Sequence, residues 1–116
     1  MEVSISTRHG SIGQDAHAYI EKKLPKLAHI FERLTSINVT IDFQKHEPEV
    51  EILVSAEHKH DFVARERNVN VTSAFDNAIA KMEMQLRKYK EKIQDHHRRS
   101  AGSAEPLADR AASEEA

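Results

Sequence analysis

The sequence predicts an α+β domain with the element order β-α-β-β-β-α. Apolar residues alternate with polar ones in four short segments, which is the period of a strand with one buried face. In two longer segments they recur every three or four residues, which is the period of one helix face. Because alternating strands offer only one apolar face, we expect a four-stranded sheet with both helices on that face, arranged as in double-stranded RNA-binding domains.

The first strand is expected at Glu2–Arg8, where Val3, Ile5 and Thr7 alternate with polar residues. A helix is expected from about Gln14 to Leu34. Its apolar positions are Ala16, Ile20, Leu24, Leu27, Phe31 and Leu34. Ser11 and Gln14 could form a capping box at its start, and Gly13 is a competing cap. Because Pro25 cannot donate a hydrogen bond to Glu21, we expect this helix to continue with a bend there.

Three more strands are expected after this helix. Residues 37–43 and 50–56 alternate cleanly and are joined by residues 45–48, which predicts a hairpin; a weaker fourth strand covers about 60–67. The connection from the first strand through the helix makes the first two strands parallel, whereas the short later connections make an antiparallel meander. The polar sheet face should be exposed and acidic, with Asp42, Glu49, Glu51 and Glu57.

The longest predicted helix runs from Val71 to Arg99, with Asn68 or Asn70 as its cap. Its apolar positions are Val71, Phe75, Ala78, Ile79, Met82, Leu86, Tyr89 and Ile93. A second stripe of this helix carries Lys81, Lys88, Lys92 and Arg99. Glu83 precedes Arg87 by four residues and should compensate it locally, so the lysine stripe is the charge expected to attract an anionic partner.

The first helix carries a second basic stripe. Turning about 100° per residue, its cations fall opposite the apolar face. They are Lys22, Lys26, His29 and Arg33. A single stripe of this kind is usually only a solvated helix face, whereas two such stripes in one small domain leave a solvated surface and a nucleic-acid surface equally open.

Composition bounds the function further. The 116 residues suit one domain with a net charge of −2, and residues 100–116 are expected to form a disordered acidic tail after a domain of residues 1–99. Residues 81–99 carry seven Lys or Arg against three acidic residues, a net of +4, so the near-neutral average hides a strongly basic segment. With no cysteine, no signal peptide and no apolar run long enough for a bilayer, we expect a soluble cytoplasmic protein without a membrane partner.

No residue pattern in the chain predicts catalysis. There is no nucleophile turn and no glycine-rich phosphate loop, so neither an enzyme, a cofactor nor a small-molecule substrate is expected. The pairs His58/His60 and His96/His97 raise the question of a metal, but a third ligand at a defined spacing is missing and no metal site is predicted. All four phenylalanines fall on core faces, so RNA would be bound by charged helices rather than by aromatic stacking.

Three motifs resemble a known family. They are Ile5-x-x-Arg8-His9, the run Tyr19-Ile20-Glu21-Lys22-Lys23-Leu24-x-Lys26-Leu27, and Ala74-Phe75-Asp76 followed by Lys81-x-x-x-Gln85-Leu86-x-Lys88-x-Lys90-x-Lys92. The resemblance is to the ribosome hibernation-promoting factors, also known as the ribosome-associated inhibitor or sigma-54 modulation protein family, and it spans about Val3 to Lys92.

The resemblance implies a translation inhibitor that binds the small ribosomal subunit and its rRNA in the channel for messenger and transfer RNA. It implies rRNA contacts for Lys22, Lys23, Lys26, Lys81, Gln85, Lys88 and Lys92, with Arg8 and His9 nearby; the basic stripe of the first helix adds Arg33. The chain is similar to the short forms of the family, and the free protein is expected to be a monomer. The alternative is a stress-related module that docks an acidic protein and does not bind ribosomes.

Overall fold

The computed structural model describes residues 1–57 and 60–101, with side chains described through residue 94, and it confirms the predicted order of strands and helices. The elements are β1 (Glu2–Arg8), α1 (Gln14–Lys23), α2 (Pro25–Ile30), β2 (Leu34–Asp42), β3 (Glu49–Ala56), β4 (His60–Arg67) and α3 (Val71–Ala101). His58 and most of the predicted acidic tail, residues 102–116, lie outside the described residues, and the side chains of His96, His97 and Arg99 are likewise not described.

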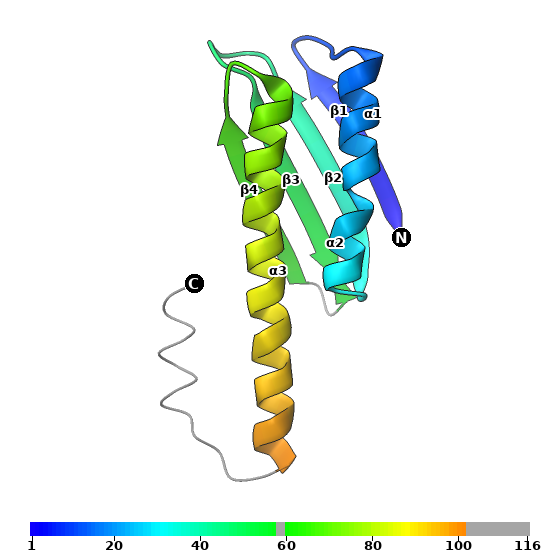
Figure 1. Ribbon diagram of the computed structural model, residues 1–116, viewed down its shortest axis with the longest axis vertical. Coiled ribbons are helices and arrows are strands. Elements are labelled where there is room, and N and C mark those ends of the chain that lie inside the picture. The colour runs from blue at the N-terminus through cyan, green and yellow to red at the C-terminus, as the bar shows by residue number, and fades with distance from the viewer. Residues whose placement is uncertain (58–59, 102–116) are drawn as a thin grey trace.

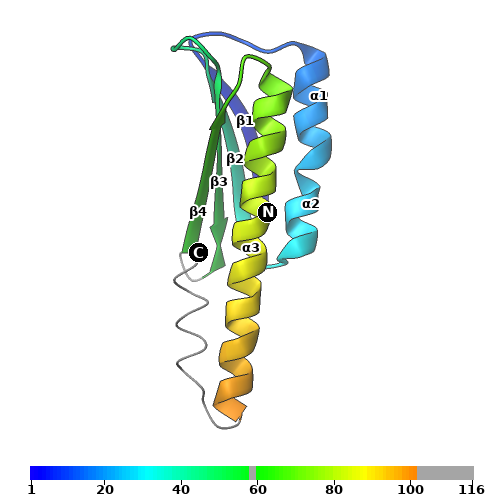
Figure 2. The same ribbon diagram turned by 60° about the vertical axis from the view of Figure 1, so that its left-hand side comes forward.

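The four strands form one mixed sheet in the order β1-β2-β3-β4 (Figure 1). β1 pairs with β2 in parallel, with Ile5 opposite Val39, as the right-handed crossover requires. β2, β3 and β4 form an antiparallel meander, with Val39 opposite Ile52 and Ile52 opposite Ala64. Figure 2 shows α1, α2 and α3 on one face of this sheet. The predicted two-layer architecture is therefore confirmed.

The core lies between the helices and the apolar sheet face. Phe75, Met82 and Leu86 of α3 are fully buried there, where α3 packs on β3 and β4. Of the other predicted positions of α3, Ala78 and Ile79 are buried and Val71, Tyr89 and Ile93 pack at the margin. In the part of the chain whose side chains are described, no polar or charged residue is buried, so hydrophobic burial supplies the main stabilising term of the fold.

The first helix departs from prediction. The expected continuous helix is divided at Leu24 into α1 and α2, and it ends at Ile30 rather than at Leu34. Pro25 removes the hydrogen bond to Glu21, yet it is well suited to the first turn of a new helix, so the chain restarts there. Phe31 is already extended, with φ −141° and ψ 115°, and Leu34 is buried in β2 opposite Ala56.

The helix starts depend on local hydrogen bonds. Gly13 is the N-cap of α1 and no side chain caps this helix, so the Ser11 capping box was a wrong prediction. Asn70 caps α3 as predicted, because its Oδ1 accepts the backbone N–H groups of Thr72 at 2.9 Å and Ser73 at 3.2 Å. Across the described part of the chain, no helix has the length and apolar character to span a membrane.

Candidate nucleic-acid interface

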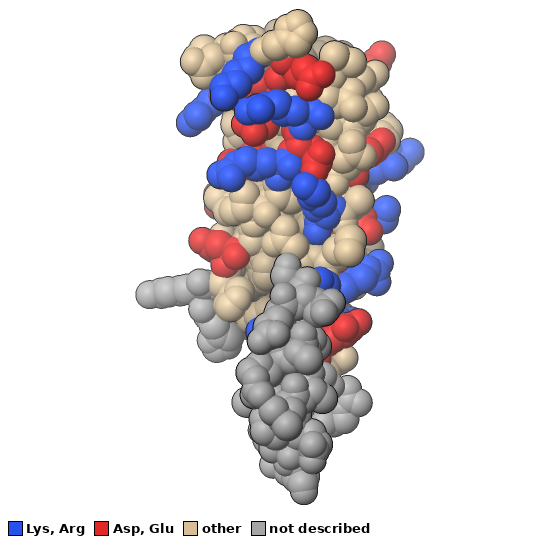
Figure 3. All heavy atoms as spheres, turned by 90° about the vertical axis from the view of Figure 1, so that its left-hand side faces the viewer, with Lys and Arg blue, Asp and Glu red and all other residues tan. Residues whose placement is uncertain are grey.

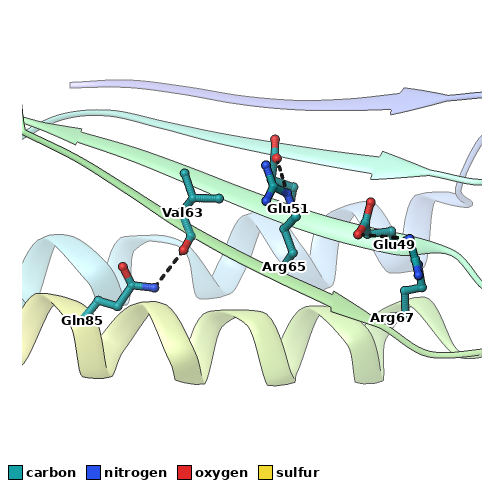
Figure 4. Close-up of polar contacts among 6 residues, drawn as sticks. All are labelled: Glu49, Glu51, Val63, Arg65, Arg67 and Gln85. Carbon is teal, nitrogen blue, oxygen red and sulfur yellow. Dashed lines mark hydrogen bonds and ion pairs between the residues drawn. The ribbon is translucent and has the colours of Figure 1, made fainter. Parts of the chain in front are cut away.

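Three lysines of α3, Lys81, Lys88 and Lys92, lie on the flank of the helix that faces β4. Lys81 forms an ion pair with Glu66 of β4, and the Gln85 side-chain amide donates a hydrogen bond of 2.8 Å to the Val63 carbonyl (Figure 4). Lys88 and Lys92 follow Lys81 by seven and eleven residues, so they continue the same row toward the C-terminal end of the helix, and both are exposed. We call Lys81, Gln85, Lys88 and Lys92 the α3 row.

The opposite flank of α3 faces α1 and α2. Tyr19 of α1 donates its hydroxyl to the Asp76 carboxylate, at 2.7 and 2.8 Å from the two oxygens. Two turns further along α3, the Glu83 carboxylate forms an ion pair of 3.2 Å with Lys26 of α2. The part-buried Tyr19–Asp76 contact ties α1 to α3, and the more exposed Lys26–Glu83 pair adds a second contact between α2 and α3.

A shallow hollow of about 310 Å³ opens at this seam. It is lined by Tyr19, Lys22, Lys23 and Lys26. The Lys23 Nζ lies 5.0 Å from the centre of the Tyr19 ring, which holds its charge at the hollow by a cation–π contact. The three lysines that line this hollow are candidates for contact with a phosphate group. We call Lys22, Lys23 and Lys26 the α1–α2 cluster.

The two basic surfaces therefore stand on opposite flanks of α3. Met84, which is 60% exposed, lies on the ridge between them. Glu83 was expected to compensate Arg87 within the helix, but it pairs with Lys26 across the seam. Lys81 was expected to lack a compensating charge, but it pairs with Glu66. In each pair the carboxylate is the less exposed side chain: Glu83 is 17% exposed against 55% for Lys26, and Glu66 is 22% exposed against 59% for Lys81. The ammonium groups therefore remain accessible to a partner.

The remaining predicted residues lie at the two ends of the sheet. Arg8 is the last residue of β1 and His9 follows it; His9 has a positive φ of 59°, and its Nδ1 lies 3.0 Å from the Asp42 carboxylate. Arg33 is exposed in the turn between α2 and β2, at the other end of β1 and β2 (Figure 1). The assignment of Arg33 to a helical stripe was wrong, because α2 ends before it.

The open sheet face is less acidic than predicted. Arg65 pairs with Glu51 at 2.8 Å and Arg67 with Glu49 at 3.5 Å, since each arginine is opposite its glutamate in the β3–β4 register (Figure 4). On the side of the molecule formed by β4 and α3, Lys and Arg side chains are interleaved with acidic ones (Figure 3). The arginines of β4 are thus paired with glutamates of the sheet, and on this side the exposed lysines of the α3 row are the better candidates for phosphate contacts.

Other chemistries find little support in the described residues. No group of three His, Cys, Asp or Glu side chains that could hold a metal ion occurs among them. Four of the described aromatic rings pack on one another: Phe31, His60, Phe62 and Tyr89. The His60 and Tyr89 rings are stacked, with their centroids 4.5 Å apart.

Sequence reasoning missed the acidic partners Asp76, Glu66 and Glu83. No local spacing could have identified them, because each contacts a residue of a different element.

Comparison with known proteins gives one consistent result. Residues 3–94 match the family described as Sigma 54 modulation protein / S30EA ribosomal protein. The chain is 29% identical over 94 residues to a ribosome hibernation promoting factor of Pseudomonas putida, covering 81% of this chain and 91% of that protein. It is 28% identical over 92 residues to the protein of the same name from Azotobacter vinelandii, and the match covers 79% of this chain and 85% of that protein.

Two solved structures share the fold. A protein from Coxiella burnetii described as a ribosomal subunit interface protein superposes with a TM-score of 0.68 at 21% identity, covering 78% of this chain and 99% of that one. The N-terminal domain of Protein Y from Thermus thermophilus superposes with a TM-score of 0.67 at 21% identity, covering 77% and 99%.

Proposed function

The chain belongs to the Sigma 54 modulation protein / S30EA ribosomal protein family, and we propose from this that it binds the small ribosomal subunit in the channel for messenger and transfer RNA and inhibits translation in idle or stressed cells. The members of this family are non-enzymatic ribosome hibernation factors. The observation that carries the proposal for this chain is the placement of cations on both flanks of one long helix, which is held by the apolar core and by the Tyr19–Asp76 hydrogen bond.

Cations on two flanks suit a channel better than a flat surface. A protein lying on flat RNA would concentrate its basic residues on one face, whereas a protein inside an RNA-lined channel meets phosphates on both sides. The α1–α2 cluster would contact one wall and the α3 row the other. Gln85 keeps its hydrogen bond to β4 in this arrangement and offers its amide oxygen to the RNA.

The affinity in this proposal comes mainly from phosphate neutralisation. Each lysine that contacts a phosphate releases condensed counterions, so binding weakens steeply as salt rises. The specificity comes from shape, because the helices are packed rigidly on the sheet and present their cations at fixed separations. One copy would fill the channel of an inactive cytoplasmic ribosome, and messenger RNA would then be excluded by occupancy alone.

Co-sedimentation with ribosomes at several salt concentrations tests the proposal. The chain should pellet with the small subunit at moderate salt and leave it as salt rises. Lys22→Glu and Lys92→Glu, which alter one flank each, should both weaken binding about tenfold and lower the salt slope by roughly 0.7–1 per lost contact. Lys45→Glu is the matched control, because Lys45 is also exposed but lies in the β2–β3 hairpin, and this variant should bind as the wild type does.

The possible results separate the models. Loss of binding in only one of the two flank variants would contradict the two-walled contact. A wild-type chain that stays in the supernatant at low salt would contradict ribosome binding altogether and favour the protein-docking module.

A further inference from the structure

The two edge strands of the sheet, β1 and β4, differ in the partners of their outward backbone groups. At the β4 edge, Gln85 of α3 donates a hydrogen bond to the outward Val63 carbonyl, so one of the free backbone groups of that edge has a partner. β1 forms the other edge, and no strand follows it there (Figure 1). Val3 of β1 is 44% exposed. An uncovered edge strand presents unpaired backbone groups and is a ready template for another strand.

The direction of the free groups of β1 follows from one hydrogen bond. The Phe43 N–H donates to the Arg8 carbonyl at 2.9 Å, so the backbone of Arg8 faces β2. Since backbone groups alternate in direction along a strand, Val3, Ile5 and Thr7 point their N–H and C=O groups away from the sheet. Along the described chain no other segment pairs with them.

We propose that the occupant of this edge is a second copy of the same chain, with the two β1 strands antiparallel about a two-fold axis at Ile5. In this register Ile5 is opposite Ile5 of the second copy, and Val3 is opposite Thr7. All three outward residues of each copy then form hydrogen-bonded pairs, so no outward group within the paired segment is left without a partner. The two sheets join into one continuous sheet of eight strands.

Side-chain charge selects the same register. Glu2 and Arg8 lie on the open face of the sheet, and the two-fold register puts Glu2 of each copy opposite Arg8 of the other. Ser4 of each copy is then opposite Ser6 of the other, and these two small polar side chains are compatible neighbours on the open face. Sliding the strands by two residues in either direction leaves a charged end without its counterpart and removes a hydrogen-bonded pair. Backbone pairing and charge therefore agree on one arrangement.

This association refines the expectation of a free monomer. Two seven-residue edge strands bury less surface than a stable dimer interface requires, so the dimer should be weak and form at high protein concentration. The β1 edge carries neither the α1–α2 cluster nor the α3 row, and of the predicted RNA-contact residues it includes only Arg8. Self-association is therefore a property of the free protein, and its test does not depend on ribosome binding.

Sedimentation velocity of the full chain, from micromolar to millimolar concentration, tests the proposal. The wild type should pass from monomer to dimer over this range. Glu2→Arg should raise the dissociation constant at least about tenfold, because it creates two like-charge contacts with Arg8. The double variant Glu2→Arg with Arg8→Glu should restore the dimer. Glu32→Arg is the control for the same charge change at an exposed site away from the edge, and it should dimerise as the wild type does.

A backbone variant removes the dependence on charge. Val3→Pro deletes one outward N–H at an exposed edge position where proline is tolerated, so the chain should stay folded by circular dichroism and become monomeric. Amide exchange at Val3, Ile5 and Thr7 should slow as the wild-type concentration rises. A wild type that is monomeric at millimolar concentration, or a dimer unaffected by both Val3→Pro and Glu2→Arg, would overturn the proposal.

Discussion

Asp42 shows how a single carboxylate is accommodated at the end of a strand. In the β2–β3 register it lies opposite Glu49, a pairing of like charges that would by itself be unfavourable. Arg67 pairs with Glu49, while Asp42 accepts hydrogen bonds from the Gln44 backbone N–H at 2.9 Å and from His9 Nδ1 at 3.0 Å. These bonds favour the ionised form, so the Gln44 N–H, followed by His9, lowers the pKa of Asp42 below its ordinary value of 3.8.

A carboxyl titration by NMR checks this assignment. Because the folded-state pKa of Asp42 is lowered, its contribution to stability is complete above pH 3.8 and is lost as the pH falls through the lowered value. His9→Ala should raise the midpoint of Asp42, but only part of the way, since the Gln44 N–H remains. The urea-unfolded chain gives the reference midpoint. A wild-type midpoint equal to that reference would refute the role of both hydrogen bonds.

At the scale of the element, α3 is anchored to the sheet by its N-terminal half. Phe75 is fully buried, and the Tyr19 ring meets it edge-on with centroids 6.3 Å apart. Near the far end of the sheet, Tyr89 packs against Phe31 and Phe62, and from there the helix continues past the sheet (Figure 1). The cations of α3 are thus held by packing of its apolar face, which separates the residues that fold the helix from those that contact a partner.

Phe75→Ala measures this anchoring. It should lower the free energy of unfolding by about 3–5 kcal/mol, because it removes a large buried side chain and leaves a cavity. Met84→Ala, on the exposed ridge of the same helix, should change it by less than about 0.5 kcal/mol. Urea unfolding followed by circular dichroism gives both values. Equal effects of the two substitutions would mean that the buried face of α3 has been assigned wrongly.

At the scale of the whole molecule, acidic residues shape the basic surface as much as the lysines do. Glu83 from α3 and Glu66 from β4 each hold a lysine of the interface. A carboxylate in this position orients the ammonium group, and it also competes with an incoming phosphate for it. For an exposed lysine the competition should dominate, because a flexible ammonium group in water gains little from being oriented.

Glu83→Gln tests whether competition dominates. The substitution removes one negative charge beside Lys26 while preserving the shape of the side chain, so ribosome binding should tighten about threefold at low salt and the gain should disappear at high salt. Glu47→Gln makes the same charge change in the β2–β3 hairpin and should have little effect. Weaker binding of Glu83→Gln would show instead that the ion pair positions Lys26 for the RNA.

The sequence alone determined the order of the elements, the buried face of each and a cap at Asn68 or Asn70, because these depend on neighbours within a few residues; the structure shows that Asn70 is the cap. Local periodicity could not decide where the first helix ends, since Leu34 fits the apolar face of a helix as well as the inward face of a strand. The tertiary structure decided it, because β2 pairs with β3 from Leu34 onward and Pro25 had already divided the helix.

The lysines of the candidate site were also identifiable from the sequence, because their spacing is a helical one. Their partners were not: Lys26 meets Glu83 and Lys81 meets Glu66 only after α2, α3 and β4 pack together. The opposite flanks of the two basic surfaces and the uncovered edge of β1 likewise arise from packing. The periodicity of a segment specifies which of its faces is buried, whereas the residue that lies across from it depends on elements distant in the chain.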